Sequence, residues 1–232
     1  MTEKQMETKL ADLERRIQRY EDRHEIEMLM GRYDLNHNQK NMHKTIQFYA
    51  LKQPDVSVEI ADRGCYVGEE NVRKLFESNY QIQINNGSYL MHWLCSPMIE
   101  VAGDGKTAKG VWLAPGAEVV VQKDGEGQAV WNFIRWAIDF IKEDGEWKFW
   151  HYRVFCDIKC DYEKGWCKDF FKWNYMGKMP GATDDAPIYH NPVSPTFIQE
   201  AIPACPQPYE TWTDESWIFA NEPQMYHPKN SK

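Results

Sequence analysis

His92 and Tyr33 are the residues whose chemistry and setting first indicate a reaction. His92 lies in the middle of an otherwise apolar segment that is predicted to be a strand. A neutral imidazole there can take a proton from a carbon next to a carbonyl group, or return one to a leaving hydroxyl. Tyr33 lies on the apolar face of a predicted helix, where its phenol can polarise a substrate carbonyl. The alternative is structural: a buried His satisfied by a neighbour and a core Tyr.

The last predicted strand adds candidates. Period-two counting puts Trp147, Phe149, His151 and Arg153 on one face of that strand. If that face is concave, Arg153 can pair with a carboxylate, phenolate or enolate, while Phe149 and His151 contact the ligand. The alternative is an Arg at an exposed rim and a His151 that only supports its neighbours.

Aromatic side chains make up 14% of the chain, with ten Trp. Trp112, Trp131, Trp136 and Trp150 follow the predicted sheet, and Phe133 shares a face with Trp131. This number favours a hydrophobic or aromatic small-molecule ligand bound by Trp112, Trp131 and Phe133, although core packing explains any single one of them.

Charge and motifs exclude several other functions. The net charge is −8 and the 27 Lys and Arg are scattered, which argues against nucleic acid. The sequence has no Gly-rich phosphate loop and no Gly-x-Ser-x-Gly elbow, so we expect no cofactor. The spacing of Cys156, Cys160 and Cys167 matches no zinc signature, so we expect no metal. A charged amino terminus and no long apolar run predict a cytoplasmic protein without membrane contact.

Periodicity predicts helices first and long strands afterwards. Apolar spacing predicts a long or broken helix over 4–38, a short helix over 41–50 and another opening at Gly68. Short strands are expected near 56–60 and 64–68. Four long segments joined by three turns then form an antiparallel meander over 88–102, 107–123, 128–142 and 147–160. Strands of this length twist and coil, so the sheet is expected to curve around the helices.

Two segments lie outside this unit. Met6, Leu10, Leu13 and Ile17 form a stripe on residues 1–20 that can contact another subunit. Residues 161–232 are rich in Pro, which predicts an irregular extension. Because that extension carries Trp212, Trp217 and Phe219, we expect it to pack on the body or on a neighbouring subunit.

Four stretches in order resemble the SnoaL-like, nuclear-transport-factor-two-like superfamily. They are Asp22-Arg23-His24-Glu25-Ile26 followed by Tyr33, Gly68-Glu69-Glu70-Asn71-Val72, the strand Met91-His92-Trp93-Leu94-Cys95-Ser96-Pro97-Met98-Ile99, and the hairpin Glu143-Asp144-Gly145-Glu146-Trp147-Lys148-Phe149. The resemblance covers about 20–160 and implies an α+β cone, with helices packed into a strongly curved antiparallel sheet. It also implies a homodimer or homotrimer formed through the convex sheet face.

The resemblance to the dehydratases of this superfamily implies a cofactor-independent lyase that acts on a hydroxylated aromatic or alicyclic molecule. It implies His92 as general base and acid, with Tyr33 as the polarising group. Asn38 departs from the pattern, because the dehydratases place an Asp about there; either Asn38 or Asp34 would then orient the imidazole. An isomerase or cyclase using the same site, and a binding protein without turnover, remain the alternatives.

Overall fold

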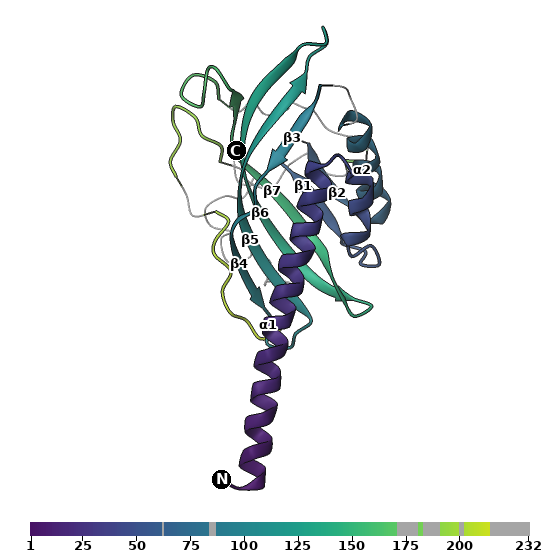
Figure 1. Cartoon of the computed structure of the whole chain (residues 1–232), viewed down its shortest axis with the longest axis vertical. Helices are drawn as coiled ribbons and strands as arrows, with labels where there is room; N and C mark the ends of the chain where they lie inside the picture. The colour runs from purple at the N-terminus through teal and green to yellow at the C-terminus, as the bar shows by residue number, and fades with distance from the viewer. Residues whose placement is uncertain (62, 84–86, 171–180, 183–190, 200–201, 214–232) are drawn as a thin grey trace, which may run out of the picture.

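Seven strands form one sheet, and one long helix crosses its concave side (Figure 1). The computed structural model describes residues 1–61, 63–83, 87–170, 181–182, 191–199 and 202–213. The first helix, α1 (Glu3–Asn38), is unbroken and begins with a capping box between Thr2 and Gln5. A 3₁₀ helix, η1 (Met42–Phe48), and a second α-helix, α2 (Glu69–Gln83), complete the helical layer.

The sheet is mixed and open. Its strands are β1 (Ser57–Ile60), β2 (Gly64–Val67), β3 (Tyr89–His92), β4 (Cys95–Val101), β5 (Thr107–Val121), β6 (Gly127–Glu143) and β7 (Glu146–Asp161). The order is β2-β1-β7-β6-β5-β3, with β4 also paired to β5. The α+β cone is confirmed in its helices and curved sheet, but two details of the prediction are wrong. β1 runs parallel to β7, and the expected strand over 88–102 is two strands.

A two-residue break and a nearby bulge mark this region of the chain. Trp93 and Leu94 separate β3 from β4, and both strands pair with β5. Ser96 has a positive φ of 50°, and the register shifts between Cys95 and Met98. An extra residue of this kind kinks the chain, so this bulge bends β4 just after it begins.

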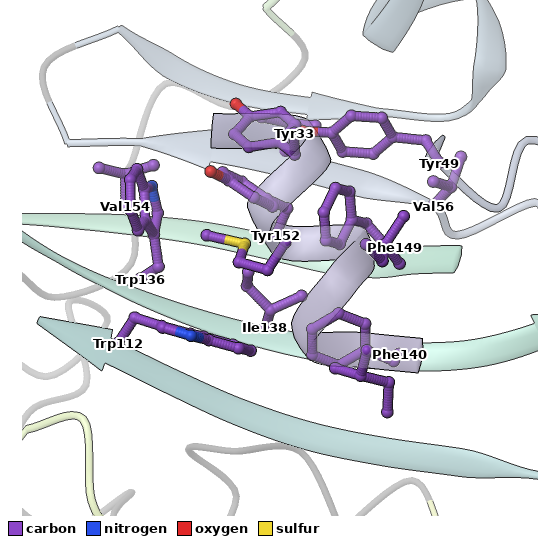
Figure 2. Packing of buried hydrophobic residues seen from close by; sticks show 14 of the residues in the cluster. Tyr33, Tyr49, Val56, Trp112, Trp136, Ile138, Phe140, Phe149, Tyr152 and Val154 are labelled. Carbon is purple, nitrogen blue, oxygen red and sulfur yellow. The ribbon is translucent and has the colours of Figure 1, made fainter. Parts of the chain in front are cut away.

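The core lies between the helices and the concave face of the sheet. The cluster is aromatic: Tyr33 of α1 lies 5.3 Å from Phe149 and 5.2 Å from Tyr152, ring centre to ring centre (Figure 2). Tyr49 and Phe140 extend the same cluster. Burial of such rings is the main apolar contribution to holding α1 against the sheet.

The described part of the carboxyl-terminal extension crosses the opposite, convex face. Ile202 is buried there with Val111, Ala137 and Phe155. Trp212 lies 4.7 Å from Trp150, ring centre to ring centre. The convex face is therefore partly covered by the chain itself. Trp217 and Phe219 lie outside the described residues.

Candidate functional site

A cavity of about 260 Å³ opens between α1 and the curved sheet. Tyr33, His37 and His92 line it together with Trp136 and Tyr152. The remaining polar side chains of its wall include Lys40, Arg63, Ser88, Tyr89, Glu118, Asn132 and Lys159. Apolar residues supply most of the other surface, so the cavity combines a hydrophobic wall with a few convergent polar groups.

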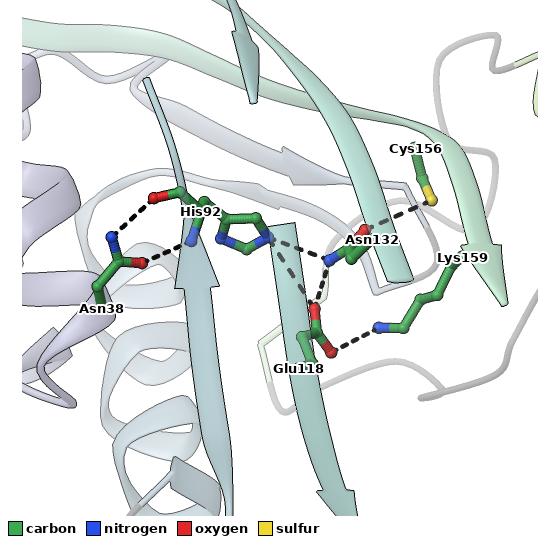
Figure 3. A network of polar contacts seen from close by, with 6 residues as sticks. All are labelled: Asn38, His92, Glu118, Asn132, Cys156 and Lys159. Atoms are coloured by element: carbon green, nitrogen blue, oxygen red, sulfur yellow. Dashed lines mark hydrogen bonds and ion pairs between the residues drawn. The ribbon is translucent and has the colours of Figure 1, made fainter. Parts of the chain in front are cut away.

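The end of α1 holds His92 through its backbone. Asn38 donates from Nδ2 to the His92 carbonyl oxygen at 2.9 Å and accepts from the His92 amide at 2.9 Å (Figure 3). β3 is an edge strand, so Asn38 takes the place of a neighbouring strand for that residue. Asn38 thus fixes the position of His92 by its main chain, and its contact with Asp34 (3.0 Å) supports the amide.

Gly116 allows the imidazole to lie close against β5. Gly116 is the register partner of His92, and a Cβ at Gly116 would stand 2.5 Å from His92 Cδ2. That distance is far below van der Waals contact. The absent side chain lets His92 reach across β5 toward β6.

A chain of polar contacts from three strands ends on the imidazole (Figure 3). Asn132 Nδ2 lies 3.1 Å from His92 Nε2 and also donates to the Glu118 carboxylate. Lys159 Nζ lies 3.3 Å from Glu118 Oε2. Cys156 Sγ lies 3.9 Å from Asn132 Oδ1. Every member of this chain of contacts is at least partly buried.

These contacts decide the tautomer of His92. The side-chain amide nitrogen of Asn132 can only donate hydrogen bonds, and it donates one of them to the Glu118 carboxylate. It must therefore also be the donor in its contact with His92 Nε2. Nε2 of His92 therefore accepts, and the neutral ring carries its proton on Nδ1. His92 Nδ1 is buried and has no hydrogen-bond partner among the described residues. A buried polar atom of this kind at a cavity wall is suited to bind a ligand.

Burial keeps the imidazole neutral. His92 is 5% exposed, and desolvation lowers its pKa to about 4, against the opposing effect of Glu118. Burial raises the pKa of Glu118, but the charges of Lys159, His92 and Arg63 and the hydrogen bond from Asn132 outweigh it and lower that pKa to about 2. At neutral pH the site therefore holds a neutral imidazole beside an ion pair, with Glu118 Oε1 4.0 Å from His92 Nε2.

A second imidazole shares the wall. His37 comes from α1, and its ring centre lies 5.4 Å from that of His92 and 5.7 Å from that of Tyr33. Its Nδ1 also has no hydrogen-bond partner within the described residues. Burial, with smaller effects of nearby charges, lowers the pKa of His37 to about 3. Two neutral imidazoles and a phenol thus meet at one end of α1.

Tyr33 and Asp34 differ in their surroundings. Tyr33 lines the cavity as expected, and burial raises its pKa to about 12, so its hydroxyl remains a donor. Asp34 bonds Asn38 and does not line the cavity. Burial raises the pKa of Asp34 to about 7, although the hydrogen bond from Asn38 opposes this. We predicted that Asn38 or Asp34 would orient the imidazole of His92. Asn38 instead bonds the His92 backbone, and Asp34 bonds Asn38.

The prediction that Trp147, Phe149, His151 and Arg153 share a face is wrong. Asp139 pairs with His151 but Phe140 pairs with Phe149, so Trp150 is an extra residue on β7. This bulge reverses the alternation. Trp147 and Phe149 lie in the core, whereas His151 and Arg153 are buried on the convex side.

Arg153 therefore lies away from the cavity. Its guanidinium is within 3.7 Å of both Glu59 and Asp139. His151 Nδ1 lies 3.0 Å from Asp139 Oδ2. The position of Arg153 does not fit the predicted anion clamp, and the cationic side chains at the cavity are Lys40, Arg63 and Lys159.

The predicted ligand-contacting aromatic residues do not line the cavity either. Trp112 and Phe149 belong to the core cluster. Trp131 and Phe133 lie on the convex side, next to Tyr162 and Trp166. Trp136 is the Trp that reaches the cavity, where it meets His92 edge to face at 5.7 Å.

Sequence comparison places the chain in a family. The SnoaL-like domain matches residues 18–153, which is more than half of the chain. The chain belongs to the SnoaL-like domain family. No curated protein sequence matches it.

Solved structures with this fold resemble the SnoaL-like domain at low sequence identity. A candidate scytalone dehydratase from Novosphingobium aromaticivorans is 15% identical with a TM-score of 0.53, covering 62% of this chain and 90% of its own. A hexachlorocyclohexane dehydrochlorinase, LinA type 2, is 14% identical with a TM-score of 0.53, covering 62% and 91%. LinA type 3 from Novosphingobium barchaimii is 14% identical with a TM-score of 0.50, covering 62% and 92%. These structural similarities support the same fold for this chain.

Sequence reasoning missed four residues of the SnoaL-like site: His37, Glu118, Asn132 and Lys159. His37 follows Tyr33 by four residues and so shares its helix face, but this spacing alone does not mark a chemical role. Glu118 and Asn132 carry a usable signal, because each is a polar residue at an inward position of an alternating strand. Lys159 carries none, since a second register shift, between Phe133 and Ile134, sets its direction.

The described residues hold no group of three or more His, Cys, Asp or Glu side chains arranged to bind a metal ion. The described helices are all too short or too polar to span a membrane. All six cysteines are free thiols.

Proposed function

We propose that this SnoaL-like domain is a cofactor-independent lyase that eliminates water, or a similar leaving group, from a small hydroxylated aromatic or alicyclic ketone. The observation that carries the proposal is the pair of neutral imidazoles at one cavity wall, that of His92 buried and that of His37 half-buried, each with a buried ring nitrogen unpaired within the described residues. Acid–base chemistry on carbon needs such groups near a dry pocket.

The tautomer of His92 assigns different roles to the two imidazoles. Because Asn132 donates to Nε2, His92 offers Nδ1–H as a hydrogen-bond donor to a substrate oxygen. A neutral imidazole can polarise a carbonyl in this way. His37 is then the group that accepts a proton. An enolate forming beside His37 would raise the pKa of its imidazolium, because an opposite charge favours the charged form.

The reaction then has two steps. His37 Nδ1 takes the proton from the carbon next to the carbonyl, and the C–H electron pair forms an enolate whose oxygen accepts from Tyr33 and His92. The His37 imidazolium next returns the proton to the hydroxyl on the neighbouring carbon. The C–O bond breaks, the carbon–carbon double bond forms, water leaves and His37 is neutral again.

Cavity size and charge restrict the substrate. Pockets for drug-sized ligands measure about 300–1,000 Å³, so about 260 Å³ suits a molecule of one or two rings. Trp136 and Tyr152 offer flat apolar contact. The names of two similar structures, a dehydratase and a dehydrochlorinase, both refer to eliminations and agree with this class.

The test is a panel of one- and two-ring β-hydroxy ketones, with product mass as the readout. We expect loss of one water from at least one compound, and loss of turnover in His37→Gln and His92→Gln. Tyr33→Phe, which removes only the hydroxyl, is expected to reduce kcat more than it changes KM.

Other outcomes redirect the proposal. An unchanged product mass with a new position for hydrogen means an isomerase or cyclase. Full activity in a folded His37→Gln protein returns the base role to His92. No turnover in the wild type, with ligand binding intact and His92→Gln costing only stability, means a binding protein.

A further inference from the structure

The projecting part of α1 carries an apolar stripe. Met6, Leu10, Leu13, Ile17 and Tyr20 are between 42% and 72% exposed, although all are large apolar or aromatic residues. Their spacing of four, three, four and three residues is that of alternating d and a positions of a heptad. Exposed stripes of this kind mark interaction surfaces.

The stripe points away from the body. Arg19 donates to the carbonyl oxygen of Val101 at 3.0 Å, and the buried Asp22 accepts from Lys142 (2.6 Å) and Trp147 (3.0 Å). In the same heptad Arg19 is at c and Asp22 at f, opposite the a/d seam. Figure 1 shows the amino-terminal half of α1 extending beyond the sheet. Most of the stability of a helix in a protein comes from packing of its apolar face, so a partner for this stripe would stabilise the projecting part of α1.

Charged residues on each side of the stripe identify the partner. Lys9 and Arg16 occupy g positions, whereas Glu14 and Glu21 occupy e positions. In a parallel pair each g residue meets the e residue of the next heptad on the other helix. Lys9 would meet Glu14 and Arg16 would meet Glu21, each of opposite charge. An antiparallel pair would place like charges together instead. None of these four residues has an ion-pair partner in the described part of the chain.

We propose that residues 6–21 of α1 form a parallel, in-register, two-stranded coiled coil with a second copy of this chain. Leu13 at d and Ile17 at a are the residue types that favour two strands in parallel assemblies. The seam ends where the next a and d positions become His24 and Glu27. Two subunits joined in this way would hold their cones on opposite sides of the shared axis.

The number of subunits tests the interface. We expect sedimentation of the full chain to show a monomer–dimer equilibrium, and Leu13→Lys to shift it to monomer across the concentrations at which the wild type is dimeric. Thr8→Lys, at an exposed f position, is the matched control and should remain dimeric. A circular dichroism spectrum and an unchanged thermal transition of the sheet domain check that Leu13→Lys is folded.

Cross-linking tests the orientation. Met6→Cys is expected to form an intermolecular disulfide, because d positions meet in a parallel pair, and Thr8→Cys is not. The wild type, with exposed Cys167 and Cys205, sets the background. Lys9→Glu with Arg16→Glu should be monomeric alone and should dimerise with a Glu14→Lys, Glu21→Lys chain.

Three results would overturn the proposal. A wild type that is monomeric at all concentrations would mean that the stripe stays unpaired or is covered by another part of the same chain. A Leu13→Lys chain that remains dimeric would move the interface elsewhere, such as to the convex face of the sheet. Equal cross-linking of Met6→Cys and Thr8→Cys would exclude the parallel register.

Discussion

Replacing His92 with Gln is expected to make the unfolding free energy less sensitive to acid. The pKa of His92 is about 4 in the folded protein because of burial, against about 6.5 in an unfolded chain. The unfolded state therefore binds more protons between these two values. Stability contributed by the neutral ring is present above about pH 6.5 and is lost as the pH falls toward 4. Gln cannot titrate, and its amide oxygen can accept from Asn132.

The magnitude follows from the two pKa values. One imidazole with these values contributes about 2 kcal/mol less to folding at about pH 4.5 than at about pH 7. The total pH dependence is a poor measure, because Asp34 acts in the opposite direction. Its pKa is raised to about 7 by burial, so it favours folding more as the solution becomes acidic. The difference between the wild type and His92→Gln removes most of that contribution.

The assay is urea unfolding of both proteins at the two pH values, together with imidazole NMR of the wild type. His24→Gln, at an exposed position, controls for the loss of an imidazole in general. Equal pH dependence in wild type and His92→Gln, or a His92 resonance that titrates near 6.5, would refute the burial argument and with it the neutral state on which the proposed chemistry depends.

Three further predictions concern residues that position the site or the sheet. Gly116→Ala should displace the His92 ring, cost about 1–3 kcal/mol and reduce ligand affinity; an unshifted His92 resonance would contradict this. Asn38→Ala should cost about 1–3 kcal/mol by leaving the His92 backbone unpaired, and Asn38→Asp should recover part of this, since a carboxylate can still accept from the His92 amide. Asp139→Asn should cost about 3–5 kcal/mol in urea unfolding, because it leaves Arg153 with less compensating charge; a change below about 1 kcal/mol would mean that Glu59 suffices.

The sequence predicted the frame of the molecule well, because periodicity and turns are local signals. The hairpin turns after Val101 and Val121 and the apolar spacing of α1 each report on structure within a few residues. His92 and Tyr33 were found as cavity residues for the same reason: each is a polar group within an apolar pattern.

The rest of the site depends on register, which no local pattern contains. The partner that contacts the His92 ring, Asn132, is forty residues away, and it meets the ring only because Gly116 lies between them. The direction of Arg153 depends on one extra residue in β7. Period-two counting fails at such a bulge, so the predicted clamp was assigned to the wrong side.

The bulge at Trp150 also affects how residues of β7 are compared among relatives. Side chains of a strand alternate between the concave and the convex face of the sheet. A deletion of one residue at the bulge would therefore move the residues on one side of it to the opposite face, without any substitution. Two relatives could then share a residue at the same place in the strand and use it on opposite sides of the sheet. A residue of β7 is therefore best matched between relatives by its partner on β6, as Asp139 identifies His151, and not by its distance along the sequence.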